Sequence, residues 1–434
     1  MNPLYRNDRP GEFPLSYYAA TADIPPVRPS LDGDVRADVA ILGAGYCGLW
    51  AALTCARAGL RVVVLEAHRA GFGASGRNGG QVGSVYNKDL NWLDQRVGQA
   101  ATDALFQISE EGKAQLRQFC EDHAPNAQYK PGIAHGGWNG SEVDDLHADA
   151  EALAERYGYD ALEFLDGPAF RDIVKSEVYK GGTLDMGAGH IHPLNYAIAL
   201  AREAEAAGAV IHELTEVTKI ETENGVRMHT NHGVLSADHG IVAGNGYLPN
   251  IVRKVAARTM PINSFIAATE PLGARALDVL TKDIAVADDR FVVNYFRLSE
   301  DKRLLFGGRE NYSLGFPTDI GTRLRQRMES LFPQISGIGV DYTWGGTLGI
   351  TTHRLPYLTR LGPTAMSAGG FSGHGVSLAG MAGRVMGEAM LGQAKRFDVL
   401  EKLPCPAFPG GAAFRAPLLT LAMAWYAMRD RLGV

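Results

Sequence analysis

The sequence predicts an α/β fold that, over the whole chain, is of the α+β type. Three observations lead to this prediction. A short apolar run, closely spaced glycines, a helix-forming stretch and a second apolar run follow one another within 38–66. Short β-branched runs then occupy 210–243, and glycine-rich segments return at 344–350 and 369–375. Apolar runs that alternate with helical stretches are typical of a sheet with helices on its faces.

The composition is that of a globular protein. The chain has 434 residues, of which 46% are hydrophobic and 21% charged, and this length predicts two or three domains. The formal net charge is −6 and no basic run occurs, so nucleic acid is not expected as a partner. The four cysteines lack the spacing of metal ligands, and no metal site is expected.

Targeting signals are not expected in this chain. The N-terminus lacks a basic region followed by an apolar core, which argues against a signal peptide. No stretch approaches the ~20 apolar residues that span a bilayer. Cys47 and Cys55 lie on the first expected helix and read as buried small groups rather than disulfide partners. These features predict a cytoplasmic protein.

The run 38–66 has the order strand, glycine turn, helix, strand. Its first five residues, 38–42, form a β-branched apolar run of the kind buried in a parallel sheet. Gly43, Gly45 and Gly48 follow in the G-x-G-x-x-G spacing. That spacing permits a tight turn, close approach of the backbone to a pyrophosphate, and close packing of the next helix. The helix, 46–58, would direct its N-terminus and positive dipole end at the phosphates.

A carboxylate closes this unit. Gly59 is placed to end the helix, and 61–65 supplies the second strand. Glu66 comes next, where it can accept hydrogen bonds from the adenosine ribose and would repel the 2′-phosphate of NADP. A glycine-rich turn in an unrelated α/β unit is the alternative, and the complete context disfavours it. The sequence therefore predicts a Rossmann-like unit that binds an adenine dinucleotide.

Helical and strand patterns continue along the chain. Apolar residues at helical spacing predict helices, and β-branched runs bounded by turn residues predict strands. The expected helices are 94–124, 145–157, 193–207 and 377–391; the expected strands are 210–213, 217–221, 226–230, 233–236, 239–243, 290–297 and 303–307; loops are expected at 344–350 and 369–375.

Two further glycine clusters accompany the first. The cluster 71–81 lets backbone N–H groups converge on an anion, and Ser75 and Asn78 add side-chain donors. The cluster 368–376 opens the helix that begins near Ser377, where N–H groups could stabilise negative charge. Taken singly, the first could be a flexible loop and the second an N-cap loop.

The clusters together resemble the flavoprotein family of D-amino-acid oxidase, glycine oxidase and monomeric sarcosine oxidase, over about residues 36–395. The segments that carry the resemblance are GFGASGRNGGQ (71–81), AGNGY (243–247), RLLFGG (303–308) and GFSGHGV (370–376). They look most like the bacterial gamma-glutamylputrescine oxidase branch. The resemblance implies FAD rather than NAD, and an inserted mixed-sheet substrate domain that covers the flavin.

The resemblance also implies a discontinuous FAD-binding domain. It would consist of 37–90, 186–250 and 340–395, with 91–185 and 251–339 as the substrate domain, 1–36 as an N-terminal arm and 396–434 as a tail.

The same resemblance implies which residues meet the cofactor. Val217 would bond the adenine through its backbone, and 373–376 would meet the pyrimidine edge of the flavin. The expected cofactor-binding residues are Gly43, Ala44, Gly45, Tyr46, Cys47, Gly48, Glu66, Ala67, Ala74, Ser75, Asn78, Gly79, Gly80, Gln81, Val217, Gly244, Gly373, His374, Gly375 and Val376.

Three departures from the family pattern bear on substrate and cofactor. Several relatives place a carboxylate-binding Arg in W-x-G-x-R-P, whereas 344–350 here contains no cation. Sarcosine oxidase has a Lys where this chain has Ser377. Relatives with covalent flavin carry a Cys after that Trp, and none occurs here, so the FAD is expected to be non-covalent. Arg77 or Arg309 could substitute for the missing carboxylate anchors.

Flavin chemistry requires an amine C–H beside the flavin, and no strong base is needed if the amine is neutral. We expect His374 and Tyr295 as catalytic residues, with Phe296 turned to the core, since neighbours on a strand face opposite sides. Gln81, Tyr295, Trp344 and His353 are expected at the substrate, although a core role for Trp344 is equally supported. His190 and His192 could lie near the flavin, but a lone histidine is more often structural.

Three functions remain open at this point. The first is oxidation of a gamma-glutamylated diamine or another long amine, with electrons passed to O₂ or a quinone. The second is an oxidase or dehydrogenase for a secondary amino acid such as pipecolate or sarcosine, and the third a non-catalytic FAD-bearing protein. The apolar run 418–428 is either a docked helix or an interfacial anchor, and peripheral membrane contact through it would favour a quinone.

Overall fold

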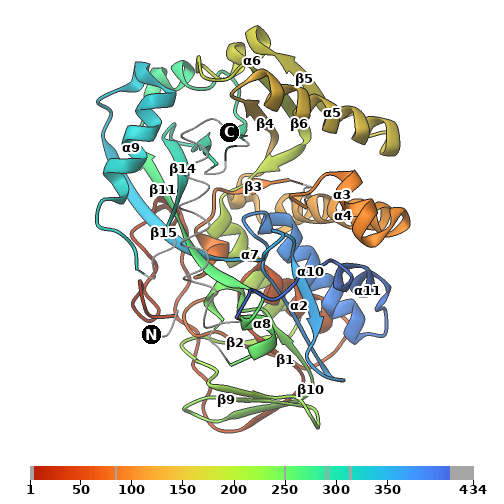
Figure 1. Cartoon of the computed structure of the whole chain (residues 1–434). Helices are drawn as coiled ribbons and strands as arrows, with labels where there is room; N and C mark the ends of the chain where they lie inside the picture. The colour runs from red at the N-terminus through yellow and green to blue at the C-terminus, as the bar shows by residue number, and fades with distance from the viewer. Residues whose placement is uncertain are drawn as a thin grey trace.

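The computed structural model describes residues 4–83, 86–248, 251–288, 290, 293–311 and 315–410, without the side chains of 309–311. The apolar run 418–428 therefore lies outside the described residues. Two sheets organise the chain, one with eight strands and one with nine (Figure 1). This confirms the expected mixed α/β fold.

The first sheet contains the predicted nucleotide-binding unit. Its strands run in the order β16 (Tyr357–Arg360), β17 (Ala365–Gly369), β10 (Val234–Val242), β1 (Val35–Leu42), β2 (Val62–Leu65) and β7 (Val210–His212). β17, β10, β1, β2 and β7 are parallel, and β16 is antiparallel to β17. Two short strands, β8 (Lys219–Glu221) and β9 (Val226–His229), extend β10 as an antiparallel ribbon.

Three helices build the main core with this sheet. α2 (Tyr46–Arg57), α7 (Pro193–Ala206) and α10 (Gly375–Met390) lie beside one another, and α2 and α10 are in close contact (Figure 1). Gly383 of α10 permits that contact, because a Cβ there would lie 2.0 Å from the carbonyl oxygen of Cys47. The core contains Val39 and Ile41 from β1 together with apolar side chains of all three helices. The N-terminus of α2 is thereby held at the carboxyl ends of β1 and β2.

The second sheet is mixed and lies at the other end of the molecule. Its strands run in the order β15 (Val340–Ile350), β11 (Met260–Thr269), β14 (Leu304–Asn311), β13 (Tyr295–Leu298), β12 (Ala285–Asp288), β4 (Lys130–Gly137), β6 (Gly181–His190) and β3 (Gln81–Val82), with β5 (Leu162–Asp166) beside β6. β12 and β4 are parallel and their neighbours antiparallel. The remaining helices are α1 (Tyr17–Thr21), α3 (Leu90–Val97), α4 (Gln99–His123), α5 (Gly140–Tyr157), α6 (Gly167–Ile173), α8 (Arg253–Ala256), α9 (Ile320–Leu331) and α11 (Lys395–Glu401).

Two expectations about strands were wrong. The segment 344–350 is not a loop but the second half of β15, paired with β11 along its length. Its glycines serve close packing rather than a turn: a Cβ on Gly345 would lie 2.8 Å from the Phe265 ring. The two strands expected at 233–236 and 239–243 are one strand, β10, because Ala237 continues the pairing with Ala37 of β1.

The expected domain segments are interleaved in space. β3 and β15, both from ranges assigned to the FAD-binding domain, belong to the second sheet, and β6 crosses the expected boundary at 186. The division of the chain at those residue numbers stays a prediction.

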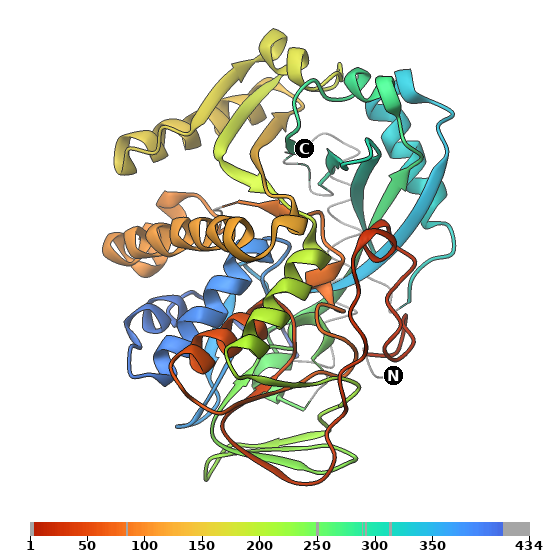
Figure 2. The same ribbon diagram turned by 180° about the vertical axis from the view of Figure 1, so that it is seen from behind.

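The N-terminal arm follows the outside of the molecule, with α1 as its helix among the described residues (Figure 2). Arg28 fixes the arm to α7 through an ion pair with Glu205 at 2.7 Å, and to the end of β7 through one with Glu213 at 3.0 Å. Across the described ranges, no helix has the length and apolarity needed to cross a membrane.

Candidate cofactor and active site

A pocket opens at the carboxyl ends of β1 and β2. It is formed by the first glycine turn, the end of β2 and three later loops. The lining residues that the sequence predicted are Gly43, Gly45, Glu66, Ala67, Ala74, Ser75, Val217 and Gly244; the others include Leu4, His68, Phe72, Thr215, Asn245 and Tyr247. Segments far apart in the sequence thus converge on one pocket.

The glycines of the first turn are required by close contacts. Gly43 has φ +99°, and a Cβ on it would lie 2.9 Å from the carbonyl oxygen of Ala243. A Cβ on Gly48 would lie 1.8 Å from the carbonyl oxygen of Gly43. Gly45 caps α2 without a side-chain hydrogen bond, and the Tyr46 N–H at the helix start donates to Ser75, so the N–H groups that follow Tyr46 in the first turn are the ones that could meet an anion. The turn therefore has the geometry of a phosphate-binding helix start.

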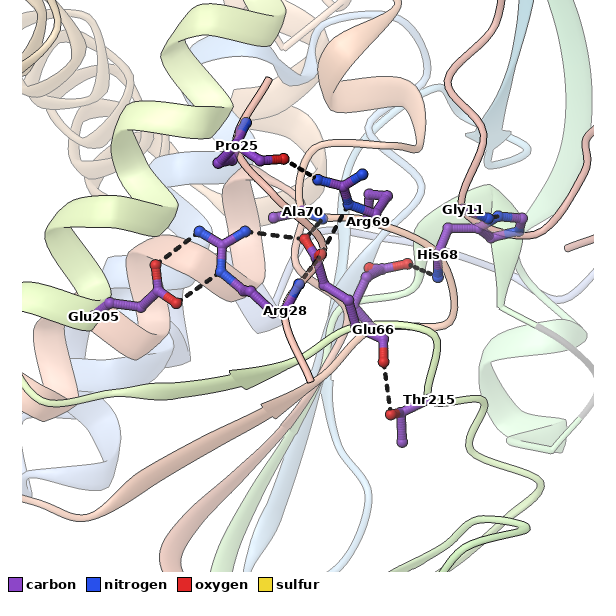
Figure 3. A network of polar contacts seen from close by, with 10 residues as sticks. Gly11, Pro25, Arg28, Glu66, His68, Arg69, Ala70, Glu205 and Thr215 are labelled. Carbon is purple, nitrogen blue, oxygen red and sulfur yellow. Dashed lines mark hydrogen bonds and ion pairs between the residues drawn. The ribbon is translucent and has the colours of Figure 1, made fainter. Parts of the chain in front are cut away.

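Glu66 lies at the pocket end of β2 and is half-buried. One carboxylate oxygen accepts a hydrogen bond from the Ala44 N–H at 2.8 Å. The other accepts one from the His68 N–H at 2.9 Å (Figure 3). Burial raises the pKa of Glu66, and the backbone donors oppose that rise. A carboxylate has about four lone-pair sites, so two remain for the hydroxyl groups of a ribose.

Ser75 and Asn78 hold their own loop in the structure. Ser75 Oγ accepts a hydrogen bond from the Tyr46 N–H at 3.0 Å, at the start of α2. The Asn78 amide donates to the carbonyl oxygens of Ala74 and Ser75, each at 3.0 Å, and accepts from the Gly80 N–H at 2.8 Å. The Asn78 amide thus donates within its own loop, whereas the Ser75 hydroxyl accepts there and keeps its proton for donation. That these two side chains donate to the cofactor stays a prediction. Their contacts shape the loop that lines the pocket.

The end of the same loop lies against the second sheet. A Cβ on Gly79 would lie 2.8 Å from Cδ2 of the Tyr295 ring, and one on Gly80 would lie 2.2 Å from the carbonyl oxygen of Ile191. The guanidinium of Arg297 donates to the carbonyl oxygens of Gly79 at 3.1 Å and Ile191 at 2.9 Å. The sequence analysis missed Arg297, although strand alternation places it on the face of Tyr295.

The strand register shows which side chains lie on the same face of the second sheet as Tyr295, next to the loop that contains Gly79. Tyr295 pairs with Ala287, and Ala287 pairs with His135 of β4, so the three side chains share one face. Phe296 is on the opposite face, where its ring packs on Phe332 at 5.1 Å between centroids. Phe296 is therefore a core residue, as expected. His135 was missed because its place depends on a pairing between distant strands.

The third glycine loop leads into α10. Gly373 has φ +94° and Ser372 has φ +53°, and His374 is the N-cap residue. Burial lowers the pKa of His374 to about 4, so its imidazole is neutral, and His135 and Arg354 reinforce that shift electrostatically. His374 Nδ1 is buried without a hydrogen-bond partner within the described part of the chain. The loop thus presents an unsatisfied polar atom beside a helix N-terminus.

Other predicted residues have structural contacts. Trp344 is buried, with its Nε1–H donating to the carbonyl oxygen of Arg77 at 3.0 Å and its ring edge-on to Tyr18. His353 packs against Trp92 and lies 3.2 Å from the carbonyl oxygen of Pro404. The structure does not bring His353 into the nucleotide pocket. Gln81 donates from Nε2 to the carbonyl oxygen of Val286 in β12 at 2.8 Å.

His190 and His192 are both buried. Burial lowers the pKa of each to about 3, so both are neutral. His192 Nδ1 accepts from the Asn195 N–H at 3.2 Å and caps α7. These contacts agree with the structural reading of the two histidines.

The cations suggested as carboxylate anchors differ in their surroundings. Arg77 is paired with Asp8 at 2.8 Å and its guanidinium stacks over the Phe72 ring at 4.3 Å. It is therefore not an unpaired cation for a substrate. The side chain of Arg309 lies outside the described residues. Ser377 donates its hydroxyl to the carbonyl oxygen of Gly83 at 2.7 Å.

Comparison with known proteins identifies clear relatives. Residues 38–389 match the family described as FAD dependent oxidoreductase. The chain is 41% identical over 417 residues to a probable oxidoreductase OrdL from Rhizobium meliloti, covering 96% of this chain and 97% of the relative. It is 38% identical over 425 residues to gamma-glutamylputrescine oxidoreductase from Escherichia coli, covering 98% of this chain and all of the relative.

A solved structure shares the fold. Glycine oxidase from Geobacillus kaustophilus superposes with a TM-score of 0.67 at 20% identity, covering 86% of this chain and 96% of that protein. Identity at this level supports the fold only.

Proposed function

The chain belongs to the FAD dependent oxidoreductase family, and we propose that it oxidises a long amine, of the gamma-glutamylputrescine type, at a C–N bond. The product imine would then be hydrolysed by water. The enzyme class and the cofactor, FAD, follow from the family; the substrate is our proposal. One observation supports this substrate most strongly. The β15 run 344–350 contains no cation and position 377 is a Ser, whereas the family pattern has a carboxylate-binding cation at these places.

The residues of the pocket fit FAD. The start of α2 and the loop shaped by Ser75 suit a pyrophosphate, and Glu66 suits the ribose. The start of α10 and the Nδ1 of His374, which has no hydrogen-bond partner among the described residues, suit a polar edge of the flavin. When bound, FAD supplies the redox step by accepting a hydride from the substrate carbon.

The protein's own residues would orient the amine. We place it between the face of Tyr295 and the loop that contains His374, since Gly79 brings the Tyr295 ring against the loop expected at the flavin. His374 has a pKa near 4, so its neutral ring would accept or donate a hydrogen bond rather than store a proton. The amine would therefore react in its neutral form, without a strong base from the chain.

The charge distribution argues for a distant carboxylate. The β15 run 344–350 carries no cation and Arg77 is paired with Asp8. Neither position offers a partner to a carboxylate next to the reacting carbon, and a buried carboxylate that stays unpaired is unfavourable by several kcal/mol. In a gamma-glutamylated diamine, the carboxylate lies many bonds from the terminal amine. Substrates of that shape avoid the penalty.

A non-covalent flavin forms part of the proposal. Burial raises the pKa of Cys47, Cys55, Cys120 and Cys405 each to about 12, so none of these thiols is poised to attack the flavin ring. We propose O₂ or a quinone as the electron acceptor.

Anaerobic reduction of the bound FAD tests the proposed function. Gamma-glutamylputrescine should bleach the yellow enzyme, while NADH at the same concentration should leave it oxidised. Bleaching by pipecolate or sarcosine instead would support a secondary amino acid oxidase or dehydrogenase. An enzyme that no amine bleaches would favour a binding protein and contradict the proposal.

A further inference from the structure

Residues 4–12, here called the N-terminal strap, lie across the pocket that binds FAD. Leu4 is one of the residues that line this pocket. The strap precedes the first strand by more than twenty residues and contains no nucleotide-binding motif. Contacts with three loops of the nucleotide-binding sheet hold the strap at the pocket.

The first contact lies at the loop that contains Val217, expected at the adenine. The hydroxyl of Tyr5 donates to the carboxylate of Glu216 at 2.9 Å. Val217 and Thr215, on either side of Glu216, both line the pocket. Tyr5 therefore fixes the strap to the loop that lines one side of the pocket.

The second contact lies beside Glu66. His68 is buried, and its Nδ1 accepts a hydrogen bond from the Gly11 N–H at 3.2 Å (Figure 3). Because Nδ1 accepts, the proton of the neutral ring is on Nε2, which donates to the Leu4 carbonyl oxygen at 2.9 Å. One imidazole thus holds both ends of the strap.

The third contact lies at the loop expected along the flavin. Asp8 forms a buried ion pair with Arg77 at 2.8 Å, and both side chains are almost inaccessible to solvent. Arg77 Nε also donates to the carbonyl oxygen of Phe72 in its own loop at 2.7 Å. The ion pair therefore connects the strap to the loop that contains Ala74 and Ser75.

A series of ring contacts, in which the His68 and Phe72 rings are parallel, joins the three contacts. The Tyr5 ring lies 5.2 Å from the His68 ring, and His68 stacks parallel to Phe72 at 3.8 Å. The guanidinium of Arg77 lies over the Phe72 ring, 4.3 Å from its centre. His68 and Phe72 also line the pocket. These ring contacts pack the strap against the wall of the pocket.

We propose that the N-terminal strap is a wall of the FAD site, and that Tyr5, His68 and Arg77 act as positioning residues that hold it closed. FAD would leave the pocket only when the strap separates from the loops at 66–68, 72–77 and 215–217. The strap would thus set the rate of FAD release. This inference depends on the cofactor, which the family establishes, and not on the proposed amine substrate.

Release of FAD from the holoenzyme tests the strap directly. After dilution of the holoenzyme, the increase in FAD fluorescence gives the rate constant for release without any amine present. Asp8→Asn removes the charge that pairs with Arg77, and should speed release at least about tenfold, since hydrogen bonds between charged groups are the strongest of their kind. Tyr5→Phe removes only the hydroxyl contact to Glu216 and should speed release about threefold.

Glu12→Gln is the matched control. Glu12 belongs to the same strap, but its ion pair with Arg9, at 3.7 Å, is exposed. The rate of FAD release from Glu12→Gln should therefore stay within about twofold of that from the unchanged protein. Unchanged release in both Asp8→Asn and Tyr5→Phe would overturn the proposal. If Asp8→Asn does not fold, FAD release from Tyr5→Phe and hydrogen exchange at the Gly11 amide test the proposal. Exchange at Gly11 should be slower in the holoenzyme than in the apoprotein. Equal exchange in the two would contradict a closed strap.

Discussion

The ring of Tyr295 lies directly against the α-carbon of Gly79, so that a Cβ on Gly79 would come within 2.8 Å of the ring carbons Cδ2 and Cε2. Gly79 belongs to the glycine-rich loop that follows the first nucleotide-binding unit, and Tyr295 to the second sheet. This contact joins the loop expected along the flavin to the sheet face at which we place the substrate. Its tightness leads to the first prediction.

Gly79→Ala should displace either the Tyr295 ring or the loop by several tenths of an ångström. Small misplacements near a reacting centre reduce rates strongly, so anaerobic reduction by the amine should slow by about tenfold or more. Stopped-flow absorbance at the flavin band measures this rate. Gly140→Ala, at the start of α5 where a Cβ meets no atom within 4 Å, is the control and should not change it. Equal rates in both variants would show that the Gly79 contact is not part of the active site.

Glu66→Ala should weaken FAD binding. The variant loses the proposed ribose hydrogen bonds and the acceptor for the N–H groups of Ala44 and His68, at about 1.5–3 kcal/mol for charge-assisted bonds. Titration of the apoprotein with FAD, followed by quenching of flavin fluorescence, gives the affinity. Glu223→Gln, on an exposed turn, is the control. Wild-type affinity in Glu66→Ala would place the ribose elsewhere.

The protein should lose stability as the pH falls from about 6.5 toward 4. His190 and His192 have pKa values lowered to about 3 and His374 to about 4, against about 6.5 in an unfolded chain. In this window the unfolded chain binds more protons than the folded protein, so the free energy of unfolding decreases with falling pH. The stability that these neutral rings contribute is fully present above pH 6.5. Thermal melts of the holoenzyme at pH 7 and pH 5 measure the loss.

His192→Asn separates this effect from general acid sensitivity. Asn retains a side-chain acceptor for the N-terminus of α7 but does not titrate. Its melting temperature should fall less between pH 7 and pH 5 than that of the unchanged protein. An equal fall in both proteins would contradict a role for His192 in the pH dependence.

The cofactor should leave the denatured chain intact. Because the four thiols are buried or half-buried with raised pKa values, no covalent link to the flavin is expected. Acid precipitation should give a colourless pellet and one equivalent of FAD in the supernatant. Flavin that remains with the pellet would require a covalent bond.

Local signals in the sequence were sufficient for much of this account. The unit 38–66 carries its own strand, turn, helix and acid, and β1, α2 and β2 form there, with β1 beginning earlier, at Val35. β13 and β14 likewise pair as adjacent strands, although β13 begins at Tyr295 and not at 290 as expected. In each case the pattern reflects residues near one another in the chain, which a single sequence displays.

The remainder depends on contacts between distant segments. Glycines in 344–350 suggest a loop when read locally, but in β15 they make room for Phe265 of the neighbouring strand. His135 reaches the face of Tyr295 through a pairing across β12, and Asp8 reaches Arg77 across 69 positions of sequence. No periodicity or motif encodes such pairings, so they required the folded structure.

We propose that the active site accepts an amine whose carboxylate is far from the reacting carbon. Comparison of kcat/KM for gamma-glutamylputrescine with the values for sarcosine, glycine, D-alanine and pipecolate tests it most directly. The account predicts a value for gamma-glutamylputrescine at least about a hundredfold above each of the others, since an unpaired buried carboxylate is unfavourable by several kcal/mol. A higher kcat/KM for any of the four short amino acids would contradict it.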